Sequence, residues 1–427
     1  MRGRALAAAV TTAVLMATPV PAAATPRAAA APAGTPVPCP RTPPPPNTKR
    51  PPRPAPPPRV PEEQRVGGDE LATPGLIVPP GAPKPPAVSA TSWVVADLDT
   101  GAVLGGCGPH EYGIPASTQK LLLAATMMPK LDPKQLVTVT RGDLDIEPGS
   151  SAVGLVQGGR YRVETVWLGL LLNSGNEAAN LLARLGGGSV AGGVAQMNAK
   201  AEELGALQTH AATPSGLDGE GQFTSAYDLA LIGRACFAIA DFRRYALTES
   251  TQIPAQPALK RPGFQIQNEN KLIYRYDGAL GGKTGFTELA RHTYVGGAQR
   301  NGRRLVVTLL NAERNPMPGW QQGATLLDWG FSLPKDASVG RLVDPGELAA
   351  ERDAPAAAPQ RPAAEPDPAD TPGPVAAYRA AEDWTRRYWP AAAATGVILF
   401  VLVIVVLARG RRERGKRRRG PGRRRAA

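Results

Sequence analysis

The chain has 427 residues, including 46 prolines and 47 glycines, and carries a formal net charge of +13. Eleven basic residues and one acid, Glu413, lie between Arg409 and Arg425, so the rest of the chain is close to neutral. A nucleic-acid-binding domain needs a basic face of its own, so the charge distribution argues against nucleic acid as a partner.

Residues 1–24 have the features of a secretory signal peptide. Arg2 and Arg4 form a basic start, residues 5–16 are apolar, and three alanines at 22–24 offer a small-residue cleavage site. We therefore expect the mature chain to lie outside the cytoplasm.

Residues 25–87 are rich in Pro, Ala and Arg, with proline runs at 43–46 and 56–58. This composition predicts a disordered, partly polyproline-like tether, because it offers little apolar surface for a core.

Residues 88–345 are predicted to form one domain. Its first elements are a strand at 92–97 and a returning strand at 102–105, joined by the turn Asp99-Thr100-Gly101. A mostly helical block follows, with short strand character at 136–140. Apolar periodicity, caps and breakers predict its helices at 115–128, 163–172, 177–185, 197–204 and from 224 or 225 onward.

The sequence of the last third of this domain predicts three strands and a helix. The strands are at 280–287, 292–299 and 304–310, and Asn301-Gly302 predicts a type I′ turn between the last two. A helix at 323–329 follows. Because every close link between strands is a hairpin, we predict an α/β (α+β) fold with an antiparallel sheet and helices on its faces.

The C-terminal region predicts a linker, a membrane span and a cytoplasmic tail. Residues 346–385 are rich in Ala, Pro and Asp, and residues 391–408 contain no charge. Eighteen residues at about 1.5 Å each just cross a bilayer core. Aromatic residues precede the span, and the basic residues 409–427 favour the cytoplasmic side and anionic lipid.

Ser117 and Lys120 carry the first chemical signal. Residues three apart share a helix face, and Ser117 is expected in a first turn whose free N–H groups favour an oxyanion. An amine acts as a base only when neutral, so Lys120 needs burial or a nearby cation to lose its proton. Lys283 is the candidate cation, and it also suits a substrate carboxylate.

Two further motifs follow in order. Ser174-Gly175-Asn176 falls in a link between two helices, and Lys283-Thr284-Gly285 falls in a strand flanked by glycines. Each motif alone is weak, but S-x-x-K, S-x-N and K-T-G in this order resemble the low-molecular-mass D-alanyl-D-alanine carboxypeptidases of the DD-peptidase/β-lactamase superfamily. The segments at 214–218 (P-S-G-L-D) and 224–228 (T-S-A-Y-D) are also similar to that family.

The resemblance implies a five-stranded antiparallel sheet between helices, a helical subdomain and a cleft between the two. It implies a serine peptidase, without cofactor or metal, that removes the terminal D-Ala from peptidoglycan stem pentapeptides and is acylated by β-lactams. The implied catalytic residues are Ser117, Lys120, Ser174 and Asn176. The implied substrate-binding residues are Lys283, Thr284, Gly285, Phe286 and Arg314, with the N–H groups of Ser117 and Phe286 as the oxyanion hole.

Three alternatives stay open at this point. A β-lactamase shares the motifs but needs a deacylating glutamate; no E-x-x-L-N pattern follows the second motif, and Glu202-Glu203 fit a helix face. A DD-endopeptidase would use the same residues on cross-links. A wall-binding protein with a decayed site is disfavoured by the intact motifs.

The cysteines and histidines give weaker signals. Of Cys39, Cys107 and Cys236, we expect the last two to form a disulfide, because both lie in the predicted domain. No G-x-S-x-G motif surrounds Ser117, so the chain's three histidines, at 110, 210 and 292, are predicted to be structural or surface residues.

Overall fold

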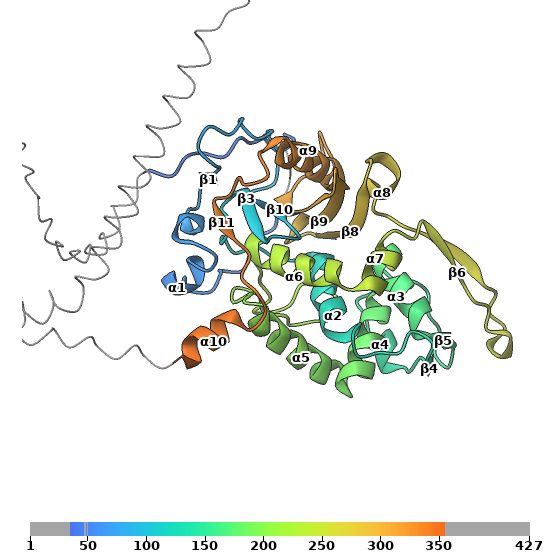
Figure 1. Ribbon diagram of the computed structural model, residues 1–427. Coiled ribbons are helices and arrows are strands. Elements are labelled where there is room, and N and C mark those ends of the chain that lie inside the picture. The colour runs from blue at the N-terminus through green and yellow to red at the C-terminus, as the bar shows by residue number, and fades with distance from the viewer. Residues whose placement is uncertain (1–34, 47, 49, 355–427) are drawn as a thin grey trace, which may run out of the picture. The chain divides into compact units, whose positions relative to one another are not determined.

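The computed structural model describes residues 35–46, 48 and 50–354 (Figure 1). The predicted signal peptide, the predicted span at 391–408 and the predicted tail lie outside these residues, as does most of the linker. Within the described part of the chain, no helix is both long enough and apolar enough to cross a bilayer.

An antiparallel sheet of five long and two short strands forms the centre of the described domain. Its strand order is β1-β3-β2-β10-β9-β8, with β11 paired to β3. The five long strands are those the sequence predicts, and two strands of two residues extend the β3 edge. The bounds are β1 Leu76–Ile77, β2 Ser92–Asp97, β3 Ala102–Cys107, β8 Ala279–Thr287, β9 Arg291–Arg300, β10 Arg303–Ala312 and β11 Gly340–Arg341.

The turn between β9 and β10 has the predicted chemistry. Asn301 and Gly302 have φ angles of 51° and 77°, the left-handed region that a type I′ turn requires at both central positions. Strand β10 pairs with β9 on one side and with β2 on the other, so it joins the last three strands of the sheet to the first strand pair.

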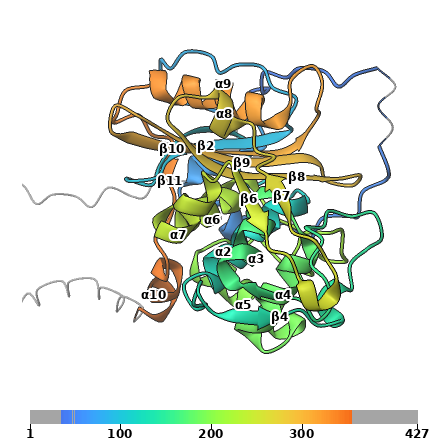
Figure 2. The same cartoon turned by 90° about the vertical axis from the view of Figure 1, so that its right-hand side faces the viewer.

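Helices cover both faces of the sheet (Figure 2). Helix α9 packs on one face, and α6 packs on the other with the helical block beyond it. The helices are α1 Pro61–Gln64, α2 Lys120–Met127, α3 Val163–Leu172, α4 Asn176–Gly187, α5 Val190–Glu203, α6 Ala226–Ala238, α7 Ala240–Ala246, α8 Leu272–Arg275, α9 Gly319–Ser332 and α10 Glu347–Asp353. The predicted helices are therefore confirmed, although α5 begins seven residues before the predicted start at 197 and α9 begins four residues before the predicted start at 323. The sequence did not predict α1, α7, α8 or α10.

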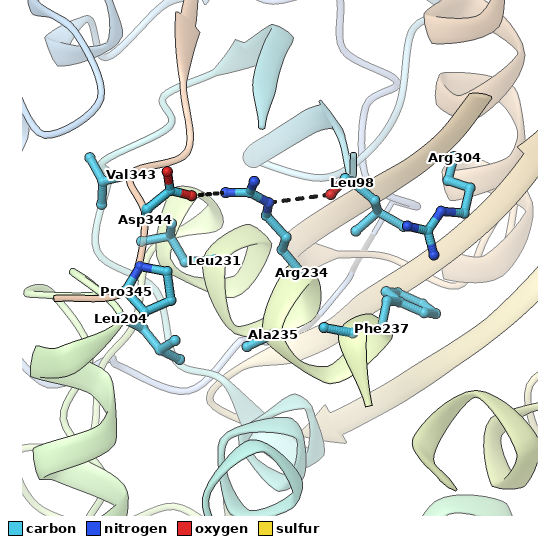
Figure 3. Close-up of a pocket in the computed structure, with 11 residues that line it drawn as sticks. Leu98, Leu204, Leu231, Arg234, Ala235, Phe237, Arg304, Val343, Asp344 and Pro345 are labelled. Atoms are coloured by element: carbon cyan, nitrogen blue, oxygen red, sulfur yellow. Dashed lines mark hydrogen bonds and ion pairs between the residues drawn. The ribbon is translucent and has the colours of Figure 1, made fainter. Parts of the chain in front are cut away.

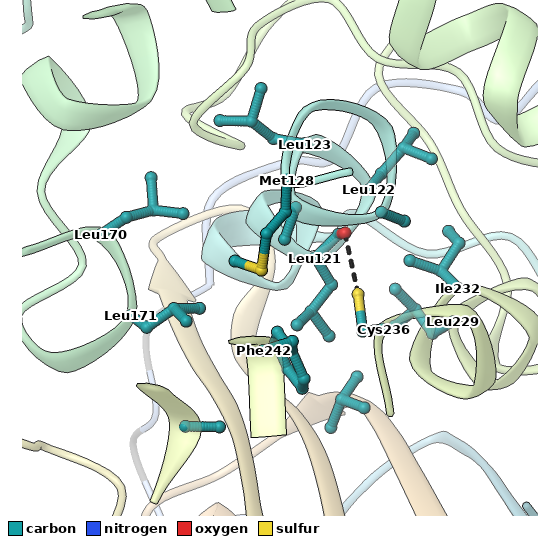
Figure 4. Close-up of a cluster of buried hydrophobic side chains, with 14 of the residues drawn as sticks. Leu121, Leu122, Leu123, Met128, Leu170, Leu171, Leu229, Ile232, Cys236 and Phe242 are labelled. Carbon is teal, nitrogen blue, oxygen red and sulfur yellow. Dashed lines mark hydrogen bonds between the residues drawn. The ribbon is translucent and has the colours of Figure 1, made fainter. Parts of the chain in front are cut away.

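The larger core cluster holds α2 in place between the sheet and the helical block. Leu121, Leu122 and Leu123 are buried there, among side chains of α3, α6 and α7 (Figure 4). Burying such side chains contributes about 1.5–3 kcal/mol each. Because α2 begins at Lys120, this packing fixes the position of the first motif.

Two small hairpins extend from the helical block. Strand β4 (Leu136–Thr138) pairs with β5 (Arg160–Arg162), and β6 (Ser250–Ile253) pairs with β7 (Phe264–Gln267). The sequence predicts β4 but not the β6–β7 hairpin, whose strands are largely exposed and polar and so lack a clear apolar alternation.

The predicted tether and disulfide both need correction. Residues 35–46, 48 and 50–87 of the predicted tether are largely placed against the domain, and Cys39 forms a disulfide with Cys107 of β3. The expected Cys107–Cys236 pairing is wrong, because Cys236 is buried in α6 with its thiol bonded to the Leu121 carbonyl. Composition indicated no fixed position for residue 39, so the correct partner was overlooked.

Removing this disulfide is expected to destabilise the domain without unfolding it. The bond joins residues 68 apart, and a cross-link of that span stabilises the folded domain by about 4 kcal/mol, because it lowers the conformational entropy of the unfolded chain. Reductant, or Cys39→Ala, should lower the melting temperature by about 8–16 °C. Circular dichroism melting checks this. An unchanged melting temperature of the wild type in reductant would contradict it, and the variant should no longer respond to reductant.

Candidate active site

Ser117 lies in a tight turn immediately before helix α2. Residues Ala116–Gln119 form one 3₁₀ turn (η2) that continues into the α-helix at Lys120. Ala116 has a φ of 46°, a left-handed conformation that is costly for a residue with a side chain. The Thr293 hydroxyl of β9 donates to the Pro115 carbonyl at 2.7 Å and ties the turn to the sheet. The predicted helix start is therefore confirmed, with a tighter first turn.

Three oxygen atoms surround the side-chain nitrogen of Lys120. Its Nζ lies 2.8 Å from the Ser117 Oγ, 2.8 Å from the Asn176 Oδ1 and 2.7 Å from the Ser215 carbonyl oxygen. The side chain is fully buried. Burial, assisted by the positive charge of Lys283, lowers the pKa of Lys120 well below its usual value, although Glu177 and Glu269 oppose this. A neutral amine in contact with a hydroxyl is the arrangement of a base and its nucleophile.

The second motif joins α3 to α4 beside this lysine. Ser174 adopts a left-handed φ of 59°, and Asn176 begins α4 with its side chain buried. The Ser174 hydroxyl is buried and has no hydrogen-bond partner in the described protein. A buried hydroxyl left without a partner is costly unless another molecule supplies one. This hydroxyl is therefore suited to a substrate group.

Glu177 fixes the loop that faces this motif. Its Oε1 accepts the backbone N–H groups of Val153, Gly154 and Leu155 at 2.7, 2.8 and 3.3 Å. The carboxylate is buried and follows Asn176 directly. Because three backbone amides donate to this one oxygen, Glu177 holds the loop at 153–155 beside the second motif.

The third motif lies on the edge strand β8. Lys283 is buried and donates to the Thr284 carbonyl at 2.8 Å. Burial lowers its pKa to about 8, although Glu269 acts in the opposite direction. Gly285 approaches the backbone of the nucleophile turn so closely that a Cβ there would lie 2.8 Å from the Ser117 nitrogen. The structure thus brings the first and third motifs together.

Replacing Gly285 by alanine is expected to displace the nucleophile. The added methyl group would meet the Ser117 nitrogen at 2.8 Å and the Thr293 Oγ1 at 2.4 Å, so β8 and the turn must separate. A misplacement of this size costs about 100-fold in kcat/KM. Gly142→Ala is the matched control, because its nearest neighbour, the Thr140 Oγ1, is 4.0 Å away. Equal activity of the two variants would contradict the contact's importance.

Phe286 of β8 and Arg314, which follows β10, line the same surface pocket. The Phe286 side chain is 44% exposed and stacks near His292, with ring centroids 4.6 Å apart. Arg314 is exposed and lines, together with Phe286 and His292, a pocket of about 390 Å³. Arg314 is therefore near the third motif but has no ion pair with another described residue.

The loop at 213–219 supplies parts that motif reasoning missed. The Ser215 carbonyl accepts from Lys120, and Gly216 has a φ of +83°. A Cβ on Gly216 would lie 1.8 Å from the Ala116 carbonyl oxygen, so only glycine fits against the nucleophile turn. The P-S-G-L-D segment was visible in the sequence, but a carbonyl contact has no residue signature and so could not be predicted.

Other features of the described residues do not join this site. A mostly apolar pocket of about 290 Å³, lined by Leu98, Leu231 and other residues, contains none of the candidate residues (Figure 3). His110 hydrogen-bonds with Gln208 and the Val66 carbonyl, and the described histidines make no hydrogen bond with Ser117. No cluster of three metal-ligating side chains is found among the described residues.

Comparison with known proteins agrees with this geometry. The profile of the D-alanyl-D-alanine carboxypeptidase family matches residues 80–314, more than half of the chain. The chain belongs to this family. It is a serine-type carboxypeptidase, a hydrolase with the DD-peptidase fold. The α/β class and the family resemblance predicted from the sequence are both confirmed.

Individual relatives support the same family. The chain is 46% identical over 263 residues to the D-alanyl-D-alanine carboxypeptidase DacB2 of Mycobacterium tuberculosis, covering 59% of this chain and 86% of that protein. It is 33% identical to DacD of Salmonella typhimurium, covering 57% of this chain and 63% of the relative.

Two solved structures show the likeness of the fold. A D-alanyl-D-alanine carboxypeptidase from M. tuberculosis superposes with a TM-score of 0.58 and 43% identity, covering 62% of this chain and all of that one. A mutant of the Streptomyces K15 DD-transpeptidase gives a TM-score of 0.55 and 25% identity, covering 58% of this chain and all of the other.

Proposed function

We propose that this carboxypeptidase removes the terminal D-Ala from peptidoglycan stem pentapeptides through an acyl-enzyme on Ser117. One observation carries the proposal: a buried lysine amine with a strongly lowered pKa lies 2.8 Å from the Ser117 hydroxyl. Such an amine takes the hydroxyl proton at neutral pH and makes the serine oxygen a nucleophile.

In the acylation step, the Ser117 oxygen attacks the carbonyl carbon of the penultimate D-Ala while Lys120 accepts the proton. The backbone N–H groups of Ser117 and Phe286 stabilise the oxyanion, which is consistent with the close approach of β8 to the nucleophile turn. Donors of this kind typically contribute about 10²–10³-fold in rate.

In the leaving-group step, a proton passes to the departing amine and free D-Ala is released. Ser174 is the proposed relay, because its hydroxyl is buried without a partner, and Asn176 holds the substrate amide while bonding Lys120. Lys283 and Thr284 receive the terminal carboxylate, with Gly285 allowing close approach and Arg314 contributing from the outer side. Water then hydrolyses the ester, with Lys120 again accepting a proton.

β-Lactams are proposed to acylate Ser117 in the same way, so the protein would bind penicillin covalently. We also propose that the catalytic domain faces the outside of the cell. The basis is the predicted signal peptide at 1–24 and the predicted span at 391–408, which also makes membrane lipid a partner.

Mass spectrometry of a stem pentapeptide after incubation with the purified full-length chain tests this function. The expected product is the tetrapeptide plus one free alanine. A pentapeptide left intact by folded protein would overturn the proposal. A shorter product that lacks the tetrapeptide end would also contradict it.

A β-lactamase and a DD-endopeptidase are the alternatives that share the motifs. A β-lactamase needs a carboxylate positioned to activate the deacylating water. Glu177, the carboxylate next to Asn176, accepts three backbone amides on its Oε1, while its Oε2 is buried without a partner among the described residues, and Glu202 and Glu203 are exposed on α5. Because Glu177 would have to break these three hydrogen bonds to move toward Ser117, they favour slow release of a β-lactam. Nitrocefin turnover at many cycles per second would favour the β-lactamase instead.

A further inference from the structure

Glu269 is an exposed acid at the edge of the candidate active site, and it has no role in the proposed mechanism. It lies in the link between β7 and α8, between the buried side chains of Asn268 and Asn270 (Figure 1). Its backbone nitrogen donates to the Leu172 carbonyl at 3.0 Å, and Leu172 is two residues before Ser174 of the second motif. This contact places the backbone of Glu269 beside the second motif.

The two asparagines hold the backbone on either side of Glu269. The Asn268 Nδ2 donates to the Ala246 carbonyl at 3.2 Å, and the Asn268 Oδ1 accepts from the Asn270 nitrogen at 2.9 Å. The Asn270 Oδ1 accepts from the Tyr294 hydroxyl of β9 at 3.2 Å. Side-chain amides bonded in this way fix the conformation of a link. The exposed carboxylate is therefore carried on a backbone of fixed position.

The first residues of β8 lie next to this link. Gly281 packs so closely on α7 that a Cβ there would lie 2.6 Å from the Ala246 carbonyl oxygen, the same oxygen that accepts from Asn268. Burial lowers the pKa of Lys283, two residues further along β8, and the nearby charge of Glu269 acts in the opposite direction. Glu269 therefore lies near Lys283, toward the start of the strand.

A substrate bound as proposed has a defined direction along this strand edge. Its scissile carbonyl lies at the Phe286 N–H group, and its terminal carboxylate lies at Lys283 and Thr284. Because β8 runs from Ala279 to Thr287, the C-terminal end of the substrate points toward the start of the strand. The side chain of the released residue is then the part of the substrate that faces Glu269.

The charges at this end of the site leave Glu269 uncompensated. Glu269 forms no ion pair with another residue of the described chain. Lys271, the cation nearest to it in sequence, has its Nζ 5.5 Å from the centre of the Tyr274 ring, in a separate pocket that Glu269 does not line. A bound terminal carboxylate neutralises Lys283, so the charge of Glu269 remains available to a cation on the substrate.

We infer that Glu269 selects the released residue by charge, so that the site favours a C-terminal D-amino acid with a cationic side chain over one with an acidic side chain. This inference rests on the proposed function and adds a preference at the leaving position. The same carboxylate attracts the cation and repels the acid, so the two effects multiply when these residues are compared. D-Ala, whose side chain is an uncharged methyl group, should fall between them.

The test measures kcat/KM of the purified full-length chain on three pentapeptides that share their first four residues and end in D-Ala, D-Lys or D-Glu. Because the acyl part is the same, effects of a substitution on the nucleophile or its base cancel in the ratio of two peptides. Wild-type protein should prefer the D-Lys peptide to the D-Glu peptide by about tenfold, the product of about threefold from attraction and about threefold from repulsion at an exposed charge.

Glu269→Gln removes the charge and keeps the shape, so the ratio should fall to about twofold or less. Glu269→Lys should invert the preference. Glu249→Gln is the matched control, because Glu249 is also exposed but lines the separate pocket beside Lys271, and its ratio should equal that of the wild type. Added salt should reduce the wild-type ratio, since salt screens exposed charges, whereas a preference for size would not respond.

Three results would overturn the inference: a wild type without preference between the D-Lys and D-Glu peptides, a ratio that Glu269→Gln leaves unchanged, or an equal fall of the ratio in Glu249→Gln. Failure of the proposed function looks different. Wild-type protein that releases no terminal residue from any of the three peptides would remove that function, and this inference with it.

Discussion

Replacing Ser117 by alanine is expected to abolish labelling by fluorescent penicillin and to lower pentapeptide turnover by about 10⁴–10⁶-fold. The hydroxyl is the atom that Lys120 contacts at 2.8 Å, and no other hydroxyl hydrogen-bonds to that amine in the described protein. The small residual rate would come from the oxyanion donors and from substrate binding, which the substitution leaves in place. Gel fluorescence and mass spectrometry of the pentapeptide measure the two effects.

Ser338→Ala is the matched control for this substitution. Ser338 is exposed in the loop before β11, and its hydroxyl bonds only to Gly340. It should label and turn over like the wild type. Equal labelling of Ser117→Ala and Ser338→Ala would show that another residue is acylated.

The pH dependence of kcat/KM is expected to be bell-shaped, because one lysine must be neutral and the other charged. Below its lowered pKa Lys120 is an ammonium and cannot accept a proton, so activity should rise with pH through that value. Lys283 has a pKa of about 8 and loses the charge that attracts a carboxylate above it, so activity should fall there. Steady-state kinetics on the free enzyme between pH 5 and pH 10 measure both limbs.

Two substitutions at Lys283 test separately the rise of kcat/KM at low pH and its fall at high pH. Lys283→Arg keeps a charge that does not titrate in this range, so the fall above pH 8 should disappear even if the rate is lower. Lys283→Met removes the positive charge that lowers the pKa of Lys120, so the rising limb should move to higher pH. A fall near pH 8 that persists in Lys283→Arg would show that another group controls it.

Much of the site was predictable because its signals are local. Ser117 and Lys120 lie one turn apart, so helical spacing alone places them on one face. The links that present Asn176 and Lys283 are bounded by clear helix and strand signals. That the three motifs come together in one site depends on contacts between distant segments, which local patterns do not reveal. It was inferred from the order of the motifs, which the family shares.

The parts that escaped prediction depend on contacts between distant segments. The Ser215 carbonyl bonds Lys120 through the backbone, which leaves no mark on residue type. Residues 35–46, 48 and 50–60 have the composition of a disordered tether, yet the Cys39–Cys107 bond and the Arg50–Glu313 pair place them on the domain. Neither contact buries enough apolar surface to produce a periodic pattern, so sequence periodicity could not reveal it.

Peptide mapping of the protein after brief exposure to a β-lactam tests the central claim most directly. The account predicts one adduct per chain at neutral pH, on the peptide that contains Ser117, and none after Lys120→Met removes the base. An adduct on a different residue would contradict the account. So would full acylation of Ser117 in the Lys120→Met variant, because the serine would then need no lysine to react.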